Sequence, residues 1–203
     1  MKDIITYIQE GFKLGKNKVR KYNYFPKDKN ELIKIIKERL AKNKYANLND
    51  INVSNIDDMS YLFVDLDPYN IDISYWDVSN VKNMEYMFYL CKNFNCDLSN
   101  WDVSNVKYMY SMFIGCENFE GKGLENWDVS EVTGMSNMFG LCEIFDCDLS
   151  KWNVSNVITM YNMFSHCKRF KGKGLENWDV SNTRNMHNMF YGCDSLKNIP
   201  SWY

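Results

Sequence analysis

One phrase recurs through three quarters of the chain, and its period constrains the fold more than any other feature. The phrase LSNWDVSNVKYMYSMFIGC at residues 98–116 has variants that begin near residues 51, 73, 124, 149 and 175. Successive marker tryptophans lie 24–26 residues apart. Self-similarity with a period of about 20–50 residues is typical of solenoids and propellers. The marker tryptophans are Trp76, Trp101, Trp127, Trp152, Trp178 and Trp202.

The positions that stay constant between copies predict which side chains face the core. In the third copy the constant residues are Met109, Met112, Phe113 and Cys116, at i, i+3, i+4 and i+7. This spacing is the apolar stripe of a short helix. Ser104 precedes the stripe, where its hydroxyl could accept a bond from a free backbone N–H as an N-cap. The pattern therefore predicts one short helix in each copy.

The residues upstream of this stripe predict a strand. Residues 98–103 read L-x-x-W-x-V, which indicates a short extended segment with one buried side. One strand and one helix in about 25 residues is typical of leucine-rich repeats, whose units bury their apolar faces only by stacking. The sequence thus predicts an α/β fold, a leucine-rich-repeat-like solenoid of about six 25/26-residue strand-helix units.

Short and long copies alternate, and the long ones contain an additional residue and two glycines. The short copies read FNCDLSNW and FDCDLSKW, whereas the long copies read FEGKGLENW and FKGKGLENW. We expect a wider turn in the long copies, with the glycines at positive φ.

The first 50 residues lack the repeat and predict an N-terminal helical cap on a solenoid that spans residues 51–203. Residues 26–43 form an amphipathic pattern, with Asp28 and Glu31 at capping-box spacing. Residues 2–13 suggest a second helix. The end of a solenoid exposes the core of its last unit, so a cap with one apolar face is expected there.

Charge is distributed unevenly between these two parts. Residues 1–50 contain 13 Lys and Arg against 6 Asp and Glu, a net +7, and the remainder contains 11 against 20, a net −9. The basic part could attract nucleic acid or a membrane surface, but we favour its docking on the acidic repeats. No apolar run reaches the roughly 20 residues that span a bilayer, and no signal-peptide pattern is present. We expect a cytoplasmic protein without membrane contact.

The seven cysteines invite a metal or disulfide interpretation. Five of them occupy the column that Leu66 fills in the first copy, which indicates a small buried apolar site. The other two create the pairs Cys91-x4-Cys96 and Cys142-x4-Cys147, which are two coils apart and unsuited to one four-ligand zinc site. We predict reduced thiols and no metal.

Other candidate chemistry also favours structural roles. The GKG segments at 121–123 and 172–174, each followed by Leu, do not match the phosphate-binding pattern G-x4-G-K-[ST]. The Asp of each WDVS segment suits an Asx-turn, which we favour over a calcium or cationic-partner ladder. His166 and His187 have no catalytic partner specified by a motif. We therefore expect no enzyme activity and no cofactor.

The run W-D-V-S-N-V-x-x-M-x-x-M-F-x-x-C-x-x-F resembles the bacterial surface protein 26-residue repeat, a relative of the BspA-like leucine-rich repeats. The segment MFYGCDSLKNIP at 189–200 is similar to the ending of the BspA type itself. The resemblance covers residues 51–203 and implies a curved solenoid with a role in protein binding or adhesion. The chain is similar to short leaderless versions encoded by AT-rich bacteria and their phages, which implies the cytoplasm of a bacterium or of an infected host cell.

We expect a monomeric, non-catalytic scaffold that binds a host or cellular protein through its solenoid surface. The alternatives are a surface adhesin-type or structural repeat protein, and nucleic-acid binding through the basic N-terminal cap. Aromatic residues at variable positions of the expected helices indicate the binding surface, because tyrosine is common in interfaces. The candidate partner-binding residues are Tyr86, Tyr89, Tyr108, Tyr110, Ile114, Tyr161 and Tyr191.

Overall fold

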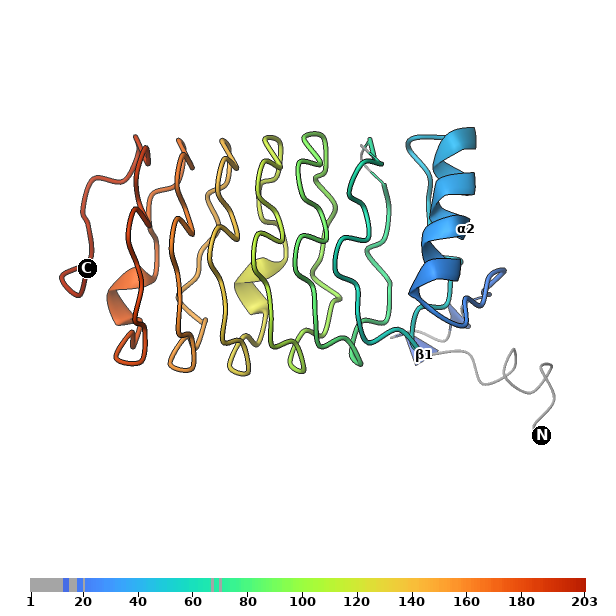
Figure 1. Ribbon diagram of the computed structural model, residues 1–203, viewed down its shortest axis with the longest axis horizontal. Coiled ribbons are helices and arrows are strands. Elements are labelled where there is room, and N and C mark those ends of the chain that lie inside the picture. Colours follow the sequence, from blue (N-terminus) through green and yellow to red (C-terminus); the bar gives the residue numbers. More distant parts are fainter. Residues whose placement is uncertain (1–12, 15–17, 20, 67, 70) are drawn as a thin grey trace.

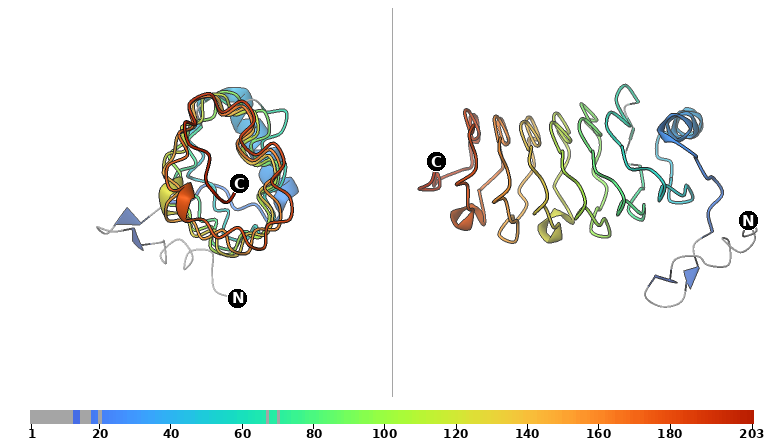
Figure 2. Two further views of the ribbon diagram at one scale, coloured as in Figure 1. Left: turned by 90° about the vertical axis from the view of Figure 1, so that its left-hand side faces the viewer. Right: turned by 60° about the horizontal axis from the view of Figure 1, so that its bottom comes forward.

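The copies stack as coils along one axis, with helix α2 (Lys29–Lys42) across the N-terminal end (Figure 1). The structure is a computed structural model and describes residues 13–14, 18–19, 21–66, 68–69 and 71–203. Seen along the axis, the coils superimpose into one closed outline (Figure 2). We number the copies first to sixth, starting at Ile51, Trp76, Trp101, Trp127, Trp152 and Trp178.

The expected fold class, an α/β leucine-rich-repeat-like solenoid of strand-helix units with a helical cap, is wrong. Among the described residues the repeats contain no α-helix and no strand, only the single-turn 3-10 segments η1 (Leu124–Asn126) and η2 (Leu175–Asn177). Consecutive copies are joined instead by isolated parallel bridges, one residue per copy: Asp58↔Asn83, Asn83↔Tyr108, Tyr108↔Gly134, Gly134↔Thr159 and Thr159↔Asn185. Each unit is therefore an irregular coil.

The segment expected to be a helix forms a hydrogen-bond ladder between copies. In the third copy the backbone N–H of Met109, Ser111, Phe113 and Gly115 donate to carbonyl oxygens of the fourth copy at 2.7–3.1 Å. In an α-helix these groups would donate to the residue four positions earlier. We call the eight residues that start at each bridge residue the ladder segment; these are residues 58–65, 83–90, 108–115, 134–141, 159–166 and 185–192.

Two left-handed residues in each ladder segment explain this departure from a helix. Ser111 (φ 53°) and Gly115 (φ 73°) lie two and six positions after Met109, and the other copies repeat positive φ at the same offsets. A left-handed residue interrupts an α-helix, yet here it turns the chain so that Met109, Met112 and Phe113 still point inward. The sequence therefore predicts the inward-facing residues correctly, but these residues lie on a ladder segment and not on a helix.

The predicted N-cap at Ser104 is also wrong, because no helix follows it. Its hydroxyl instead donates to Oδ1 of Asp102 at 2.6 Å, and its N–H donates to the same oxygen at 3.1 Å. This Asx-turn geometry recurs at the other copies, including Asn153, which accepts from the N–H of Ser155 at 3.2 Å. The prediction that the Asp column forms Asx-turns is confirmed.

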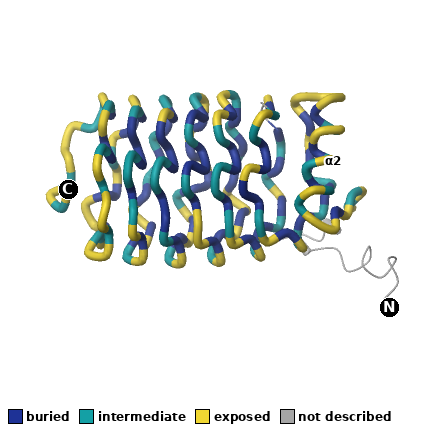
Figure 3. The backbone as a smooth tube through the Cα atoms, in the orientation of Figure 1, coloured by how far each residue is buried: buried dark blue, intermediate teal, exposed yellow. Residues whose placement is uncertain are grey.

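The constant columns fill one continuous buried cluster that runs along the whole stack (Figure 3). The phenylalanine column forms a stack of nearly parallel rings, with centroids 5.2–5.9 Å apart. Each marker tryptophan donates its indole N–H to a backbone carbonyl 27–29 residues earlier in the chain, as Trp152 does to Leu124 at 2.8 Å. The glycines of the long copies, such as Gly121 and Gly123, have the expected positive φ.

Helix α2 agrees with the helix predicted over residues 26–43. Asp28 is its N-cap and accepts from the N–H of Glu31 at 2.9 Å, while Glu31 accepts from the N–H of Lys27. Leu32, Ile36 and Leu40 lie in the same buried cluster as the repeats. Lys29 and Arg39 of this helix pair with Asp58 and Asp50. The basic segment thus contacts acidic side chains of its own chain.

Two short strands precede this helix. β1 (Lys13–Leu14) pairs antiparallel with β2 (Lys18–Val19), with Lys13 opposite Val19. The second helix expected over residues 2–13 lies outside the described residues, except for its last position in β1. No helix of the described part is long and apolar enough to cross a membrane.

Candidate functional site

The outward side chains of the ladder segments form a surface with several exposed apolar groups, which we call the ladder face. Large apolar side chains on it are exposed at Tyr61 (53%), Leu90 (46%), Tyr108 (42%), Leu141 (44%) and Tyr191 (63%). The inward Met, Phe and Cys columns of the same segments are buried. Exposure at these positions is therefore not required for packing the coil.

All seven predicted partner-binding residues lie on this face, in two groups. Tyr86, Tyr89, Tyr108, Tyr110 and Ile114 lie on the second and third copies, where Tyr86 contacts Tyr89 with centroids 5.8 Å apart and Tyr108 contacts Tyr110 at 6.4 Å. The remaining two lie toward the C-terminal end: Tyr161 stacks on His187 at 6.2 Å, and Tyr191 meets His166 edge-on at 5.1 Å.

Sequence reasoning missed Tyr61, which completes the first group. Its ring stacks on that of Tyr86 with centroids 4.8 Å apart and an angle of 10° between the planes. Tyr61 and Tyr86 occupy the same column, two residues after the first Met, so the alignment of the copies could have revealed the pair. Sequence reasoning also missed Leu90 and Leu141. Both are exposed and adopt a left-handed conformation, which the predicted helix does not contain.

Tyr110 is held in place by the neighbouring copy. A Cβ atom at Gly134 would overlap the Tyr110 ring, so the ring lies directly against the backbone of the fourth copy. Tyr110 is only half-buried despite this contact. Tyr110 therefore both packs against the neighbouring copy and contributes to the surface, whereas Tyr108 is more exposed.

A carboxylate lies among the tyrosines of the first group. Tyr61 donates its N–H to the carbonyl of Glu85, and Tyr86 donates to that of Tyr110, both at 2.9 Å. Desolvation, then the charges of Tyr86 and Glu85, raises the pKa of Tyr61. Desolvation, then Glu85 and Tyr108, raises the pKa of Tyr110. Glu85 therefore places a negative charge between tyrosines of the first and third copies.

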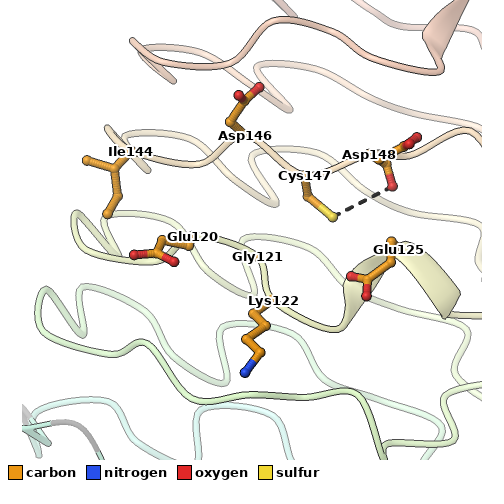
Figure 4. Close-up of a pocket in the computed structure, with 8 residues that line it drawn as sticks. All are labelled: Glu120, Gly121, Lys122, Glu125, Ile144, Asp146, Cys147 and Asp148. Atoms are coloured by element: carbon orange, nitrogen blue, oxygen red, sulfur yellow. Dashed lines mark hydrogen bonds between the residues drawn. The ribbon is translucent and has the colours of Figure 1, made fainter.

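A surface pocket of about 420 Å³ lies away from the ladder segments, between the third and fourth copies (Figure 4). Its lining residues are Glu120, Gly121, Lys122, Glu125, Ile144, Asp146, Cys147 and Asp148. Several of its polar groups already have partners: Asp146 pairs with Lys171, Asp148 with Lys173 and Lys122 with Asp97. The pocket is open and its charges are largely compensated from neighbouring copies.

Ion pairs near this pocket connect the second copy with the third and the fourth copy with the fifth. Lys92–Glu117 and Lys122–Asp97 connect the second and third copies, and three further pairs connect the fourth and fifth. In the part of the chain that the structure describes, no ion pair joins the third copy to the fourth. The hydrogen bonds from Lys122 and Lys173, with those from Ser99 and Ser150, lower the pKa of Asp97 and of Asp148 to about 2. The pocket of Figure 4 opens at the junction without such pairs.

The cysteines are all buried, including Cys147 at the floor of that pocket. The Cys147 thiol donates to the carbonyl of Asp148 at 3.7 Å (Figure 4). Burial, with nearby Glu125 and Asp148, raises its pKa to about 12. A thiol with so high a pKa is almost entirely protonated at neutral pH and is a poor nucleophile. The ladder face is therefore the stronger candidate site.

A family model described as "Mycoplasma protein of unknown function, DUF285" matches the chain twice, over residues 32–124 and residues 112–203. The two matches together reach from α2 to the last residue, and each includes several complete coils. The comparison with curated proteins gives no match, and neither does the comparison with solved structures.

Proposed function

The chain belongs to the family of repeat proteins described as Mycoplasma protein of unknown function, DUF285, and we propose that it is a non-catalytic scaffold that binds a cellular or host protein through its ladder face. The observation that carries the proposal is the exposure of large apolar side chains where the fold does not require them. Tyr61, Leu90 and Tyr108 each expose more than two fifths of their surface on three consecutive copies.

Exposed apolar groups that gather on one face are a mark of interaction surfaces. Monomeric proteins rarely expose contiguous apolar patches above a few hundred Å². Tyrosine supplies a large contact area at a low cost in conformational entropy, and it is enriched among residues that dominate binding energy. The inward columns keep the coil folded, so the outward positions are free to vary with the partner.

We further propose that the protein acts as a monomer in the cytoplasm of the cell that contains it. Seven thiols without an assigned disulfide suit a reducing compartment. Kinship with the bacterial surface protein 26-residue repeat is a further part of this proposal, supported by the fixed offsets of Trp, paired Met-Phe and Cys.

The proposal is tested by capturing the partner and then altering the ladder face. Affinity capture from the native cell, followed by mass spectrometry, supplies a purified partner. The full chain with Tyr61→Ser, Leu90→Ser and Tyr108→Ser together should bind it at least about 30-fold more weakly, since hot-spot residues each contribute about 2 kcal/mol. These side chains are exposed, so the melting temperature should change little.

A matched control changes the residues that precede the tryptophans, on another part of the coil. Tyr75→Ser with Asn126→Ser alters one aromatic that is 44% exposed and one exposed amide. Binding should stay unchanged in this variant. Loss of affinity in the control, together with full affinity in the ladder-face variant, would place the interface elsewhere and refute the proposal.

A further inference from the structure

Glu85 is an acidic residue that lies on the ladder between tyrosines of the first and third copies. Its backbone lies between that of Ser60 in the first copy and that of Tyr110 in the third, because the ladder aligns equivalent residues of successive coils. The side chain is half-buried and its Oε2 accepts only a long bond, 3.3 Å, from Nδ2 of Asn83. Among the residues that the structure describes, no Lys or Arg forms an ion pair with it.

One cation that reaches the ladder of the first copy belongs to α2 and is already engaged. Nζ of Lys29 bonds Ser60 at 2.7 Å and Asp58 at 3.1 Å, so it neutralises the carboxylate of the first copy. In the second copy the equivalent positions are Asn83 and Glu85. Among the described residues, Asp58 in the first copy is thus paired with a lysine, whereas Glu85 in the second copy forms no ion pair.

Tyrosines flank Glu85 on the ladder, because Tyr86 follows it in the chain and Tyr61 donates its N–H to the Glu85 carbonyl. Tyr61 and Tyr86 stack in parallel, and Tyr86 also contacts Tyr89 at an angle of 58°. The more exposed ring of the stacked pair, Tyr61, leaves about half of its surface open to a partner. The raised pKa values of Tyr61 and Tyr110, to which Glu85 contributes, agree with a carboxylate near both hydroxyl groups.

We propose that Glu85 and the stacked rings of Tyr61 and Tyr86 bind an arginine side chain of the partner protein. The inference rests on the proposed function and specifies the chemistry of the partner. Charge complementarity favours a cation beside Glu85, and the flat faces of the tyrosines favour a planar one. A guanidinium stacks on aromatic rings while it donates two parallel bonds to a carboxylate, which a lysine ammonium cannot do. Cation–π attraction adds to this preference.

The test uses the intact chain and a short probe, the blocked tripeptide acetyl-Gly-Arg-Gly-amide. Its control is the same peptide with citrulline, which keeps the planar shape and removes the charge. Binding is followed by the shifts of the backbone amide signals of residues 60–61, 85–86 and 110 in nuclear magnetic resonance titrations. The arginine peptide should bind about ten-fold more tightly than the citrulline peptide, because charge and stacking act together.

Two variants locate the site. Glu85→Gln keeps the shape and Asn83 contact but removes the charge, and should weaken arginine binding about five-fold or more. The matched control Glu176→Gln removes an exposed charge from the fifth copy and should leave binding unchanged. Amide spectra of both variants report whether the fold is retained.

Equal affinity for the two peptides, or an unchanged affinity in Glu85→Gln, would overturn this inference. These outcomes are separate from a failure of the proposed function. If the triple ladder-face variant loses the natural partner whereas Glu85→Gln binds it normally, the ladder face is the interface but arginine recognition at Glu85 is wrong.

Discussion

The thiol of Cys116 donates a hydrogen bond to the carbonyl oxygen of Phe88, 3.1 Å away in the preceding copy. Equivalent bonds follow along the stack from Cys142, Cys167 and Cys193, each 3.0 Å long. The column is therefore more than a small apolar site, because its side chain also satisfies a buried carbonyl between coils. The first copy, which follows α2 rather than another coil, has Leu66 at this position.

Removing such a thiol should destabilise the stack. Cys142→Ala removes the thiol bond to the carbonyl of Phe113, which retains its bond from the N–H of Cys116 at 2.9 Å, so we expect a loss of about 0.5–1.5 kcal/mol. Cys147→Ala is the control, since the bond of that thiol to the carbonyl of Asp148 is long, 3.7 Å. Denaturant unfolding measures both. Equal losses in the two variants would show that the bond between copies contributes nothing.

Stability should decline at alkaline pH through the buried thiols. Burial raises the pKa of Cys96 to about 11 and that of Cys147 to about 12, against about 8.5 for a free thiol. The folded state holds these protons more tightly, so the contribution to stability is complete below about pH 8.5 and is lost as pH rises toward 11–12.

Thiol reagents measure the burial of the cysteines directly. At pH 8 the native protein should react slowly at all seven cysteines, and the denatured protein should show seven free thiols without reductant. Fast reaction of Cys96 or Cys147 in the native state at pH 8 would contradict the assigned burial. Fewer than seven thiols after denaturation would contradict the prediction of reduced cysteines.

The carboxylate of Asp97 should titrate near pH 2 because Lys122 and Ser99 donate to it. Lys122→Met should raise its pKa toward the ordinary value of about 3.9. The lowered folded pKa gives a contribution to stability that is present above about pH 3.9 and is lost as pH falls through 2. The pair is exposed, so the melting temperature at pH 7 should barely change. Carboxyl carbon shifts measured against pH provide the test, and an unmoved Asp97 would refute the pairing.

The left-handed positions should reject β-branched residues. Asn137 has φ 57°, where Asn and Gly are tolerated and Val is strained. Asn137→Val should cost about 1–3 kcal/mol, whereas Asn137→Gly should be close to neutral. Circular dichroism during thermal unfolding compares the two. Similar melting temperatures would mean that this residue does not adopt the left-handed conformation.

The phenylalanine column should be the strongest contributor to stability. Phe139 is fully buried and stacks on Phe113, Phe145 and Phe164, with centroids 5.8, 4.2 and 5.6 Å away. Phe139→Ala should cost about 3–5 kcal/mol. Because each coil shares its core with its neighbours, we expect a single transition at a lower temperature. An unchanged transition would show that the column does not face the core.

Much of the local structure followed from the residues alone, because it depends on short-range chemistry. The Asx-turn of Asp102 with Ser104, the positive φ of Gly121 and the capping box of Asp28 with Glu31 all involve residues a few positions apart. The period and the inward columns are visible once the copies are aligned. Tyr86, Tyr89, Tyr108 and Tyr110 of the first group were also recognisable, since a variable outward position that contains tyrosine is visible in aligned copies.

The tertiary structure alone decided the path of the backbone and the composition of the site. The spacing of Met109, Met112, Phe113 and Cys116 suits both a helix and a ladder segment. The two are distinguished by the N–H groups of Met109 and Phe113, which donate to the next copy and not to the residue four positions back. The stack of Tyr61 on Tyr86 likewise joins residues 25 positions apart. Such contacts depend on how one coil registers on the next, and register is set by hydrogen bonds between copies that no single repeat contains.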